Sequence, residues 1–278
     1  MKEKRLTLLK NKPDVIDEKR IREYLQTKWL GNTILYAEKM DSTNNRAKQL
    51  GEQDTENGTV VVTGYQTSGR GRRGNTWVSP EGNCYFSILL RPEVMSDRVS
   101  MITLVSALAL TKAIKQVTGL DAMIKWPNDI IVNSKKLCGI LTESSMDQTG
   151  IHYVVVGIGI NCNQIEFSKD IVGMATSIRL ETGKEISRSK LFGTFLNIFE
   201  TYYEVFLETE DLSKFLEEYN NLLINRGKEV KIIEKDKERI LTAIGIDEKG
   251  GLIVKDGQGR KEMIISGEVS VRGLYGYV

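Results

Sequence analysis

The sequence contains very little cysteine and histidine. The three cysteines among its 278 residues, Cys84, Cys138 and Cys162, are scattered and show no C-x-x-C spacing. A disulfide framework and a cysteine-based zinc site are therefore not supported, and a reducing compartment is expected. Because His152 is the single histidine, a zinc hydrolase or a histidine-dependent catalytic triad would lack the side chains it needs.

Long apolar runs are also missing. The longest apolar stretches, such as residues 151–160, have about ten residues, well short of the roughly 20 that span a bilayer. The charged N-terminal segment MKEKRLTLLKNKPD has no apolar stretch typical of a signal peptide. We therefore expect a soluble, cytoplasmic protein with no membrane partner.

Neither sign of charge dominates. The chain has 39 basic and 37 acidic side chains and a formal net charge of +2, which argues against a broadly basic nucleic-acid coat protein. Its 40% apolar and 27% charged residues are near the globular average and argue against extended disorder. The length allows one large domain, or a large domain with a small one.

The hydrophobic pattern divides the chain into three parts. Residues 1–32 are charged, with one short amphipathic pattern that ends at Gly31. Residues 33–224 alternate between strand-like and helix-like segments. Residues 225–278 have no helical period and contain short strand patterns separated by glycine turns, which is typical of a small β-barrel or sandwich. In the middle part we expect strands at 32–39, 59–64, 83–90, 122–125, 129–132, 136–143 and 151–159, and helices at 42–50, 96–117, from 187 and at 211–223.

The glycine- and arginine-rich segment GRGRRG occupies residues 69–74. It matches G-x-G-x-x-G, but a dinucleotide fold needs a helix directly after it, and here Pro80, Gly82 and a strand follow. Three arginines so close together repel one another unless an anion gathers them. A phosphate or carboxylate clamp and an ordinary solvated basic loop both remain open on this observation. Trp77 could stack on a nucleobase or simply pack against the protein.

Three further segments have a local structural explanation and a functional one. KWPND at 125–129 is either a surface turn or a rigid cation–anion pair beside a site. GIGIN at 157–161 places glycines in a buried strand, which implies close approach of another backbone or a ligand. DSTN at 41–44 is a good helix cap on local grounds alone.

Taken together, these segments give the chain a clear resemblance to biotin–protein ligases over residues 33–278. The motifs that carry it, in the family's order and spacing, are DSTN at 41–44, QTSGRGRRG at 66–74, KWPND at 125–129, KLCGIL at 136–141 and GIGIN at 157–161. GRGRRG with KWPND downstream is the most specific combination. The resemblance implies an α+β fold: a mixed, largely antiparallel sheet flanked by helices, similar to class II aminoacyl-tRNA synthetases, followed by an SH3-like β-barrel.

The resemblance also implies an activity. Such an enzyme joins biotin to ATP, with Mg²⁺ on the ATP phosphates, to form biotinyl-5′-AMP and pyrophosphate. It then transfers the biotinyl group to a lysine of the biotin carboxyl carrier domain of acetyl-CoA carboxylase or another biotin-dependent carboxylase, and AMP leaves. The acceptor remains open, and so does the choice between monomer and homodimer.

Site residues are implied by position in the motifs. Lys125, Arg70 and Arg72 correspond to the catalytic residues, with Lys125 resembling the family's catalytic lysine. The biotin-binding set is Ser42, Thr43, Asn44, Gln66, Arg70, Gly71, Arg72 and Lys125. Trp77, Asn128 and Asn161 are expected at the nucleotide, and Asp129 as an orienting carboxylate. No protein ligand is assigned to a metal.

The chain departs from the bifunctional members of this family, which carry a winged helix-turn-helix domain ahead of the catalytic domain. Only 41 residues precede Ser42, so we expect a monofunctional ligase without a DNA partner. Two alternatives remain. A lipoate–protein ligase shares the architecture but would lack GRGRRG. An RNA-binding module could use the Arg-Gly loop, although a net charge of +2 and the lack of aromatics interleaved with the basic residues argue against it.

Overall fold

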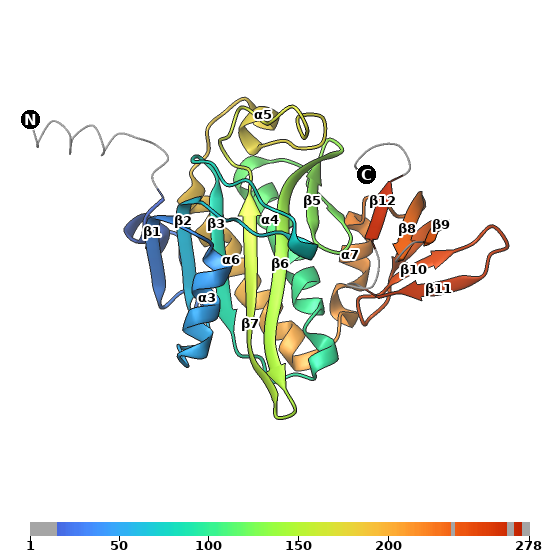
Figure 1. Ribbon diagram of the computed structural model, residues 1–278, viewed down its shortest axis with the longest axis horizontal. Coiled ribbons are helices and arrows are strands. Elements are labelled where there is room, and N and C mark those ends of the chain that lie inside the picture. Colours follow the sequence, from blue (N-terminus) through green and yellow to red (C-terminus); the bar gives the residue numbers. More distant parts are fainter. Residues whose placement is uncertain (1–15, 235–236, 266–269, 274–278) are drawn as a thin grey trace, which may run out of the picture.

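The computed structural model describes residues 16–234, 237–265 and 270–273, and it contains two sheets (Figure 1). The large sheet has seven strands in the order β1-β2-β3-β7-β6-β5-β4. Strands β1 and β2 pair in parallel, and every other pairing in this sheet is antiparallel. Its strands are β1 Ile34–Met40, β2 Val60–Gln66, β3 Cys84–Leu90, β4 Met123–Lys125, β5 Asp129–Val132, β6 Lys135–Asp147 and β7 Gly150–Ile160.

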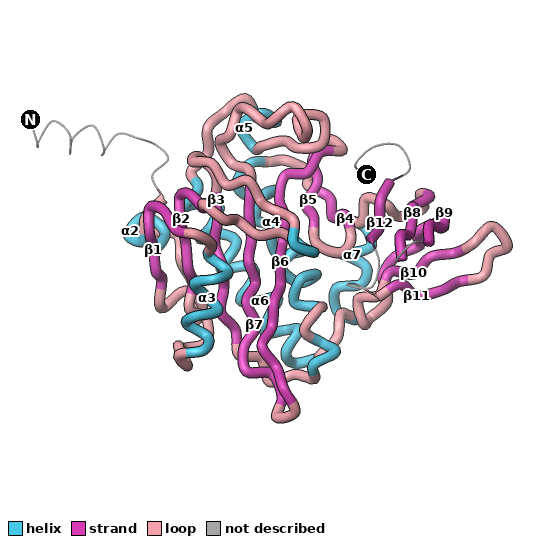
Figure 2. Tube along the Cα trace, viewed as in Figure 1, coloured by secondary structure: helices cyan, strands magenta, loops and turns pink. Residues whose placement is uncertain are grey.

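Helices cover both faces of this sheet (Figure 2). Helix α3 (Thr43–Glu52) packs on one face, where Ala47 and Leu50 meet Val61 and Tyr153. Helices α4 (Met101–Thr118) and α6 (Arg188–Thr209) pack on the other face. Because β3 is covered from both sides, all seven of its residues are buried, which explains its nearly continuous apolar sequence. The shorter helices are α2 Glu18–Arg22, α5 Ile178–Thr182 and α7 Leu216–Leu222.

The segment Ser96–Thr118 is long and apolar enough to cross a membrane by length and composition alone. However, 67% of its most apolar stretch is buried inside the protein, as expected of a core helix. We expected one helix from Ser96, but a 3-10 turn at Ser96–Arg98 comes first and the α-helix begins at Met101.

The second sheet is antiparallel throughout, with the order β11-β10-β9-β8-β12. Its strands are β8 Glu229–Glu234, β9 Lys237–Ile246, β10 Leu252–Lys255, β11 Lys261–Ile264 and β12 Ser270–Gly273. The expected fold class is therefore confirmed: a mixed, largely antiparallel sheet flanked by helices, followed by a small antiparallel β unit. Residues 1–15 of the expected N-terminal segment, and 235–236, 266–269 and 274–278 of the small β unit, lie outside the described residues.

One buried tryptophan joins the two sheets. The Nε1 of Trp126, at the end of β4, donates a hydrogen bond of 3.0 Å to the carbonyl oxygen of Gly250, in the turn between β9 and β10. Gly250 has φ +80°, and a Cβ there would lie 3.1 Å from Leu104 of α4. The backbone N–H of Leu212 also donates to Glu248 O at 2.8 Å. The KWPND segment is thus held from behind by the small sheet.

We predict that Trp126→Phe loosens this joint. Phenylalanine is aromatic, although smaller, and has no donor for Gly250; loss of this hydrogen bond alone should lower the free energy of unfolding by about 1–3 kcal/mol. Trypsin should also cut faster at the exposed Arg226 and Lys228, in the connection between the two sheets. Urea denaturation and limited proteolysis measure the two effects.

The matched control is Trp29→Phe, which removes an indole bond of 3.1 Å to Glu204, far along the chain from the joint. If both variants change the cleavage rate between the sheets equally, the Trp126 bond is not what fastens them.

Candidate active site

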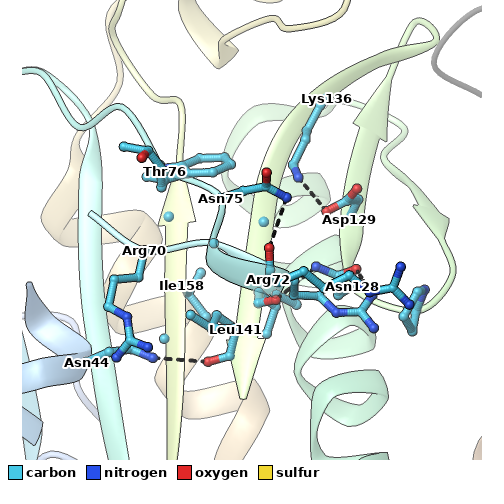
Figure 3. A pocket seen from close by; sticks show the side chains of 18 of the residues that line it. Asn44, Arg70, Arg72, Asn75, Thr76, Asn128, Asp129, Lys136, Leu141 and Ile158 are labelled. Carbon is cyan, nitrogen blue, oxygen red and sulfur yellow. Dashed lines mark hydrogen bonds and ion pairs between the residues drawn. The ribbon is translucent and has the colours of Figure 1, made fainter. Parts of the chain in front are cut away.

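A cavity of about 480 Å³ lies on the sheet face that carries α3, beneath the loop joining β2 to β3 (Figure 3). It is lined from four directions: the start of α3, the loop, the turn between β4 and β5, and strands β6 and β7. The structure brings eleven of the twelve residues expected at the site onto its wall. They are Ser42, Thr43, Asn44, Gln66, Arg70, Gly71, Arg72, Trp77, Lys125, Asn128 and Asp129.

One end of the cavity is polar but neutral. The Thr43 N–H donates to Gln66 Oε1 at 2.9 Å, and Gln66 Nε2 donates to Ser79 Oγ at 2.9 Å. The hydroxyl of Ser87 on β3 lies 2.7 Å from Asn44 Oδ1 and 2.8 Å from Thr43 Oγ1. These bonds fix hydroxyl and amide groups at the start of α3, so their directions are set before any ligand arrives.

Ser42 lies at the cavity as expected but does not act as a side-chain cap, and Ser87 was not expected at the site. Ser42 occupies the N-cap position of α3, but its side chain makes no capping hydrogen bond; it is 1% exposed and lines the cavity. Ser87 was missed. The signal for it is a serine among apolar and aromatic residues in a buried strand, where a polar group needs a partner.

The arginine loop, residues 66–79, is a folded hairpin. Gln66 pairs with Ser79 and Arg70 pairs with Thr76 as isolated antiparallel bridges. A Cβ at Gly69 would lie 2.2 Å from the carbonyl oxygen of Trp77, so only glycine allows the two arms to come this close. The hairpin carries its arginines over the cavity.

Trp77 lies directly on the sheet. A Cβ at Gly159 would be 2.5 Å from its Nε1, and one at Gly139 would be 3.0 Å from its six-membered ring. Gly139 and Gly159 face each other across β6 and β7. The buried Trp77 Nε1 has no hydrogen-bond partner among the described residues. The indole therefore forms a flat wall with an unused donor beside the cavity.

The other end of the cavity is cationic. Five cationic side chains and a single carboxylate, Asp129, are among the described residues that line the cavity. The cations at this end are Arg72, Arg73, Lys125 and Lys136, whereas Arg70 lies on the opposite side of the cavity beside Asn44, where Glu143 pairs with its charge. Lys125 at the end of β4 is 6% exposed and Asp129 is 9% exposed. Such a low-dielectric, positively charged wall favours anionic ligands.

Arg72 connects the loop to the KWPND turn. Its Nη1 donates to Asn128 Oδ1 at 2.9 Å, and Asn128 Nδ2 donates to the Ile140 carbonyl at 3.0 Å. Burial lowers the pKa of Arg72 below its ordinary value, while the charge of Asp129 acts in the opposite direction. The guanidinium stays charged, because arginine is not deprotonated in proteins.

Lys136 is a second site residue that the sequence did not identify. Its Nζ lies 2.6 Å from Asp129 Oδ1 and 5.2 Å from the centroid of the Trp77 ring. The expected strands at 129–132 and 136–143 are joined by a short turn at Asn133–Ser134, where both residues have positive φ, 48° and 63°. That turn brings the start of β6 back beside β5, with Lys136 opposite Ile131.

Asn161 is the one expected site residue that does not line the cavity. It is 5% exposed, and its Nδ2 donates to the Thr176 carbonyl at 3.0 Å. Its N–H donates to Leu137 O at 2.9 Å. In this structure its amide holds the segment before α5 against the sheet.

Two family models match the chain. The biotin/lipoate A/B protein ligase family matches residues 36–161, and the biotin protein ligase C-terminal domain matches residues 227–272. The bifunctional ligase/repressor BirA of Bacillus subtilis is 32% identical over 255 residues, covering 91% of this chain and 78% of its own length. A biotin–[acetyl-CoA-carboxylase] ligase of Paracoccus denitrificans is 31% identical over 238 residues, covering 84% of this chain and 98% of its own.

A solved structure agrees with these relatives. The biotin protein ligase from Aquifex aeolicus in complex with biotin and ATP has 33% sequence identity and a TM-score of 0.78. The match covers 87% of this chain and 99% of that one. The chain therefore belongs to the biotin–protein ligase family and is an enzyme that attaches biotin to proteins.

Proposed function

We propose that this enzyme forms biotinyl-5′-AMP from biotin and ATP, with release of pyrophosphate. It then transfers the biotinyl group to a lysine of the biotin carboxyl carrier domain of acetyl-CoA carboxylase or another biotin-dependent carboxylase, and AMP is released. The observation that carries the proposal is the division of one cavity into a neutral polar end and a cationic end.

The neutral end suits the ring system of biotin. Its ureido group is uncharged and carries both donors and an acceptor, so hydroxyl and amide partners match it better than charged ones. Thr43, Asn44 and Gln66 offer such groups in directions fixed by neighbouring hydrogen bonds. Lipoate has no ureido group, and this end would leave its own polar groups unpaired against a dithiolane ring.

The cationic end suits the reaction itself. The biotin carboxylate must attack the α-phosphorus of ATP, and the two groups are both anionic. Lys125, Lys136 and Arg72 place positive charge where negative charge accumulates in the transition state. The product is a mixed anhydride that water hydrolyses, so the arginine loop lying over the cavity also serves to exclude water.

Trp77 provides a surface for the adenine base. Its ring lines the cavity next to cations, which is a suitable arrangement for base stacking in a phosphate-binding site. Asp129, the single carboxylate among the described lining residues, holds Lys136 in place. It is also the available acceptor for the proton that the incoming lysine must lose before it attacks.

Magnesium would enter with ATP. Within the described residues no group of three His, Cys, Asp or Glu side chains could hold a metal ion. Asp129 fits the role of one protein ligand to an ion that is bound mainly by substrate phosphates and water.

The deciding experiment incubates the enzyme with ATP, magnesium and a biotin carboxyl carrier domain, with biotin in one sample and lipoate in another. Mass measurement of the carrier should show one added biotinyl group and no lipoyl group. A carrier that is lipoylated and not biotinylated would show that lipoate is the substrate. An unmodified carrier in both samples would show that the proposed function is wrong.

We predict that Lys136→Met lowers biotin-dependent ATP–pyrophosphate exchange by about 100–1,000-fold, the usual loss for one transition-state donor. Methionine keeps most of the side-chain volume and removes the charge. Lys112→Met is the matched control, because Lys112 also pairs with a carboxylate (Glu218, 2.9 Å) and lies 4.9 Å from an aromatic ring. Equal exchange rates in the two variants would contradict a role for Lys136.

We also predict that Gly159→Ala weakens the binding of ATP but not that of biotin. The new methyl group would collide with Trp77 and displace the proposed base platform. The dissociation constant for ATP should rise about tenfold or more, and that for biotin should stay within about twofold. Calorimetry measures both. Gly257→Ala, where a Cβ meets nothing within 4 Å, is the control. An equal loss for both ligands would mean that Trp77 does not act on the nucleotide specifically.

A further inference from the structure

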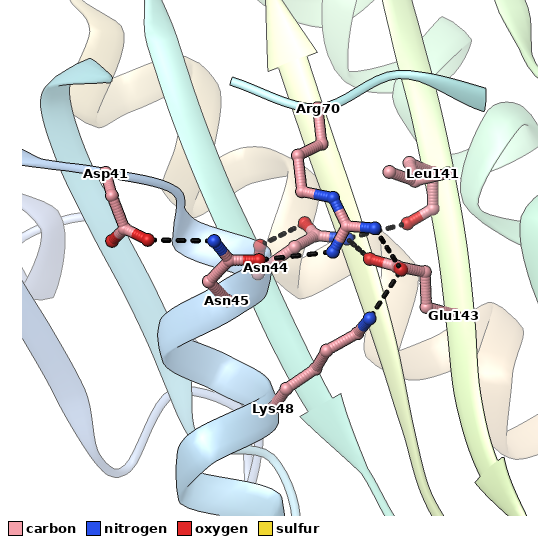
Figure 4. Close-up of polar contacts among 8 residues, drawn as sticks. Asp41, Asn44, Asn45, Lys48, Arg70, Leu141 and Glu143 are labelled. Carbon is pink, nitrogen blue, oxygen red and sulfur yellow. Dashed lines mark hydrogen bonds and ion pairs between the residues drawn. The ribbon is translucent and has the colours of Figure 1, made fainter. Parts of the chain in front are cut away.

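A polar cluster forms where the arginine loop, α3 and β6 meet (Figure 4). At its centre is Glu143 on β6, whose side chain is 17% exposed and which is not part of the cavity lining. Its Oε1 lies 3.1 Å from Arg70 Nη2 and 2.5 Å from Lys48 Nζ, and its Oε2 accepts from Asn44 Nδ2 at 2.9 Å. One carboxylate thus joins the loop, the helix and the strand.

Arg70 is held from two sides in this cluster. Besides its ion pair with Glu143, its Nη1 donates to Asn45 Oδ1 at 3.1 Å, and Asn45 Nδ2 donates to Asp41 Oδ2 at 2.8 Å. The guanidinium therefore spans the space between α3 and β6 (Figure 4). Arg72 makes the second side-chain attachment of the loop, at Asn128. The two arginines fasten the hairpin at opposite sides of the cavity.

Glu143, together with the Leu141 carbonyl, also decides which way the Asn44 amide points. Asn44 Nδ2 donates to Glu143 and to the Leu141 carbonyl, and Asn44 Oδ1 faces Ser87. A Cβ at Gly157 would lie 1.7 Å from Asn44 Oδ1, so the amide fits only because that position is glycine. With the carboxylate in place, the amide has one favourable orientation at the neutral end of the cavity.

The charge of Glu143 is maintained by its neighbours. Burial disfavours the ionised form, but hydrogen bonds from Lys48 and Asn44 and the charges of Lys48 and Arg70 outweigh it, so the pKa of Glu143 lies below its ordinary value. Without this negative charge, Arg70 and Lys48 would face each other as like charges.

We propose that Glu143 is a positioning residue of this enzyme: it anchors Arg70, so that the arginine loop stays closed over the neutral end of the cavity, and it aims the amide of Asn44. It acts through these two residues and touches neither reacting group. The kinetic part of this inference rests on the function proposed above.

The variant Glu143→Gln keeps the size of the side chain and removes its charge. We expect biotin and biotinyl-5′-AMP to dissociate about 10–100-fold faster, the loss that corresponds to one hydrogen bond to a charged group. The rate of pyrophosphate exchange at saturating biotin and ATP should stay within about threefold. A dissociation rate equal to that of the wild type, or a collapse of the saturated rate, would overturn the proposal.

Glu218→Gln is the matched control. Glu218 also pairs with a lysine, Lys112, at 2.9 Å and accepts a second hydrogen bond from Tyr202, far from the loop. It should leave ligand dissociation unchanged. If both glutamate variants speed dissociation alike, the effect is general destabilisation and the proposal is wrong.

A double-mutant cycle tests the route through Arg70. If Glu143 acts on the loop through Arg70, then Glu143→Gln combined with Arg70→Gln should dissociate ligand clearly more slowly than the product of the two single effects, because only the part of the effect that acts through Asn44 remains. Losses that simply multiply would show that Glu143 does not act through that arginine, and the anchoring role would fall.

Hydrogen exchange separates this inference from the proposed function. The N–H groups of Gly71 and Trp77 donate within the loop hairpin, to Asn75 O and Gly69 O. In protein without added ligand, Glu143→Gln should speed their exchange relative to both wild type and Glu218→Gln, while exchange in β7 stays unchanged and reports an intact fold. This holds even if biotin is not the substrate. Unchanged exchange in the loop would overturn the anchor.

Discussion

The site depends on three places in the central strands where no side chain projects. Gly139, Gly157 and Gly159 leave the backbone of β6 and β7 bare on the face that carries α3. Trp77 rests on two of them and Asn44 fills the space above the third. A loop and a helix can therefore touch the sheet directly, and the hollow that remains between them is lined by the loop, the helix and the sheet. Ordinary β-branched residues at these positions would keep loop and helix away.

The cavity concentrates positive charge, and nearby carboxylates reduce the repulsion between its cationic side chains. Two carboxylates, Asp129 and Glu143, lie on either side of the arginine loop, each paired with a lysine. Each neutralises only part of the local charge, so the site stays attractive to anions without its cations pushing the loop away. The balance between attraction for ligand and cohesion of the empty loop is thus set by two acidic side chains.

Much of this could be predicted from the sequence, because periodicity and turn residues report local structure. The strands, the core helix α6 and the arginine loop follow from patterns within a few residues. The motifs located ten lining residues, and the family resemblance gave Trp77 just beyond one of them. Lys136 begins the motif KLCGIL, but its place at the cavity and the role of Glu143 were not found, since they come from strand register and from a contact with a distant loop. Asn161 shows the reverse: it belongs to a motif, yet its amide bonds to backbone behind the cavity wall.

The hydrogen bond between Trp126 and the Gly250 carbonyl limits how the sequences of the two sheets can change in evolution. Every residue has a carbonyl, so what the bond demands of the small sheet is the shape of one turn, with a left-handed residue that lacks a Cβ beside Leu104. The hydrogen bond places no constraint on the other residues of the β9–β10 hairpin. Among relatives, the sequence of the C-terminal unit should therefore vary widely, whereas an insertion in this turn should not be tolerated. The length of the turn is the feature that we expect to be kept at the junction.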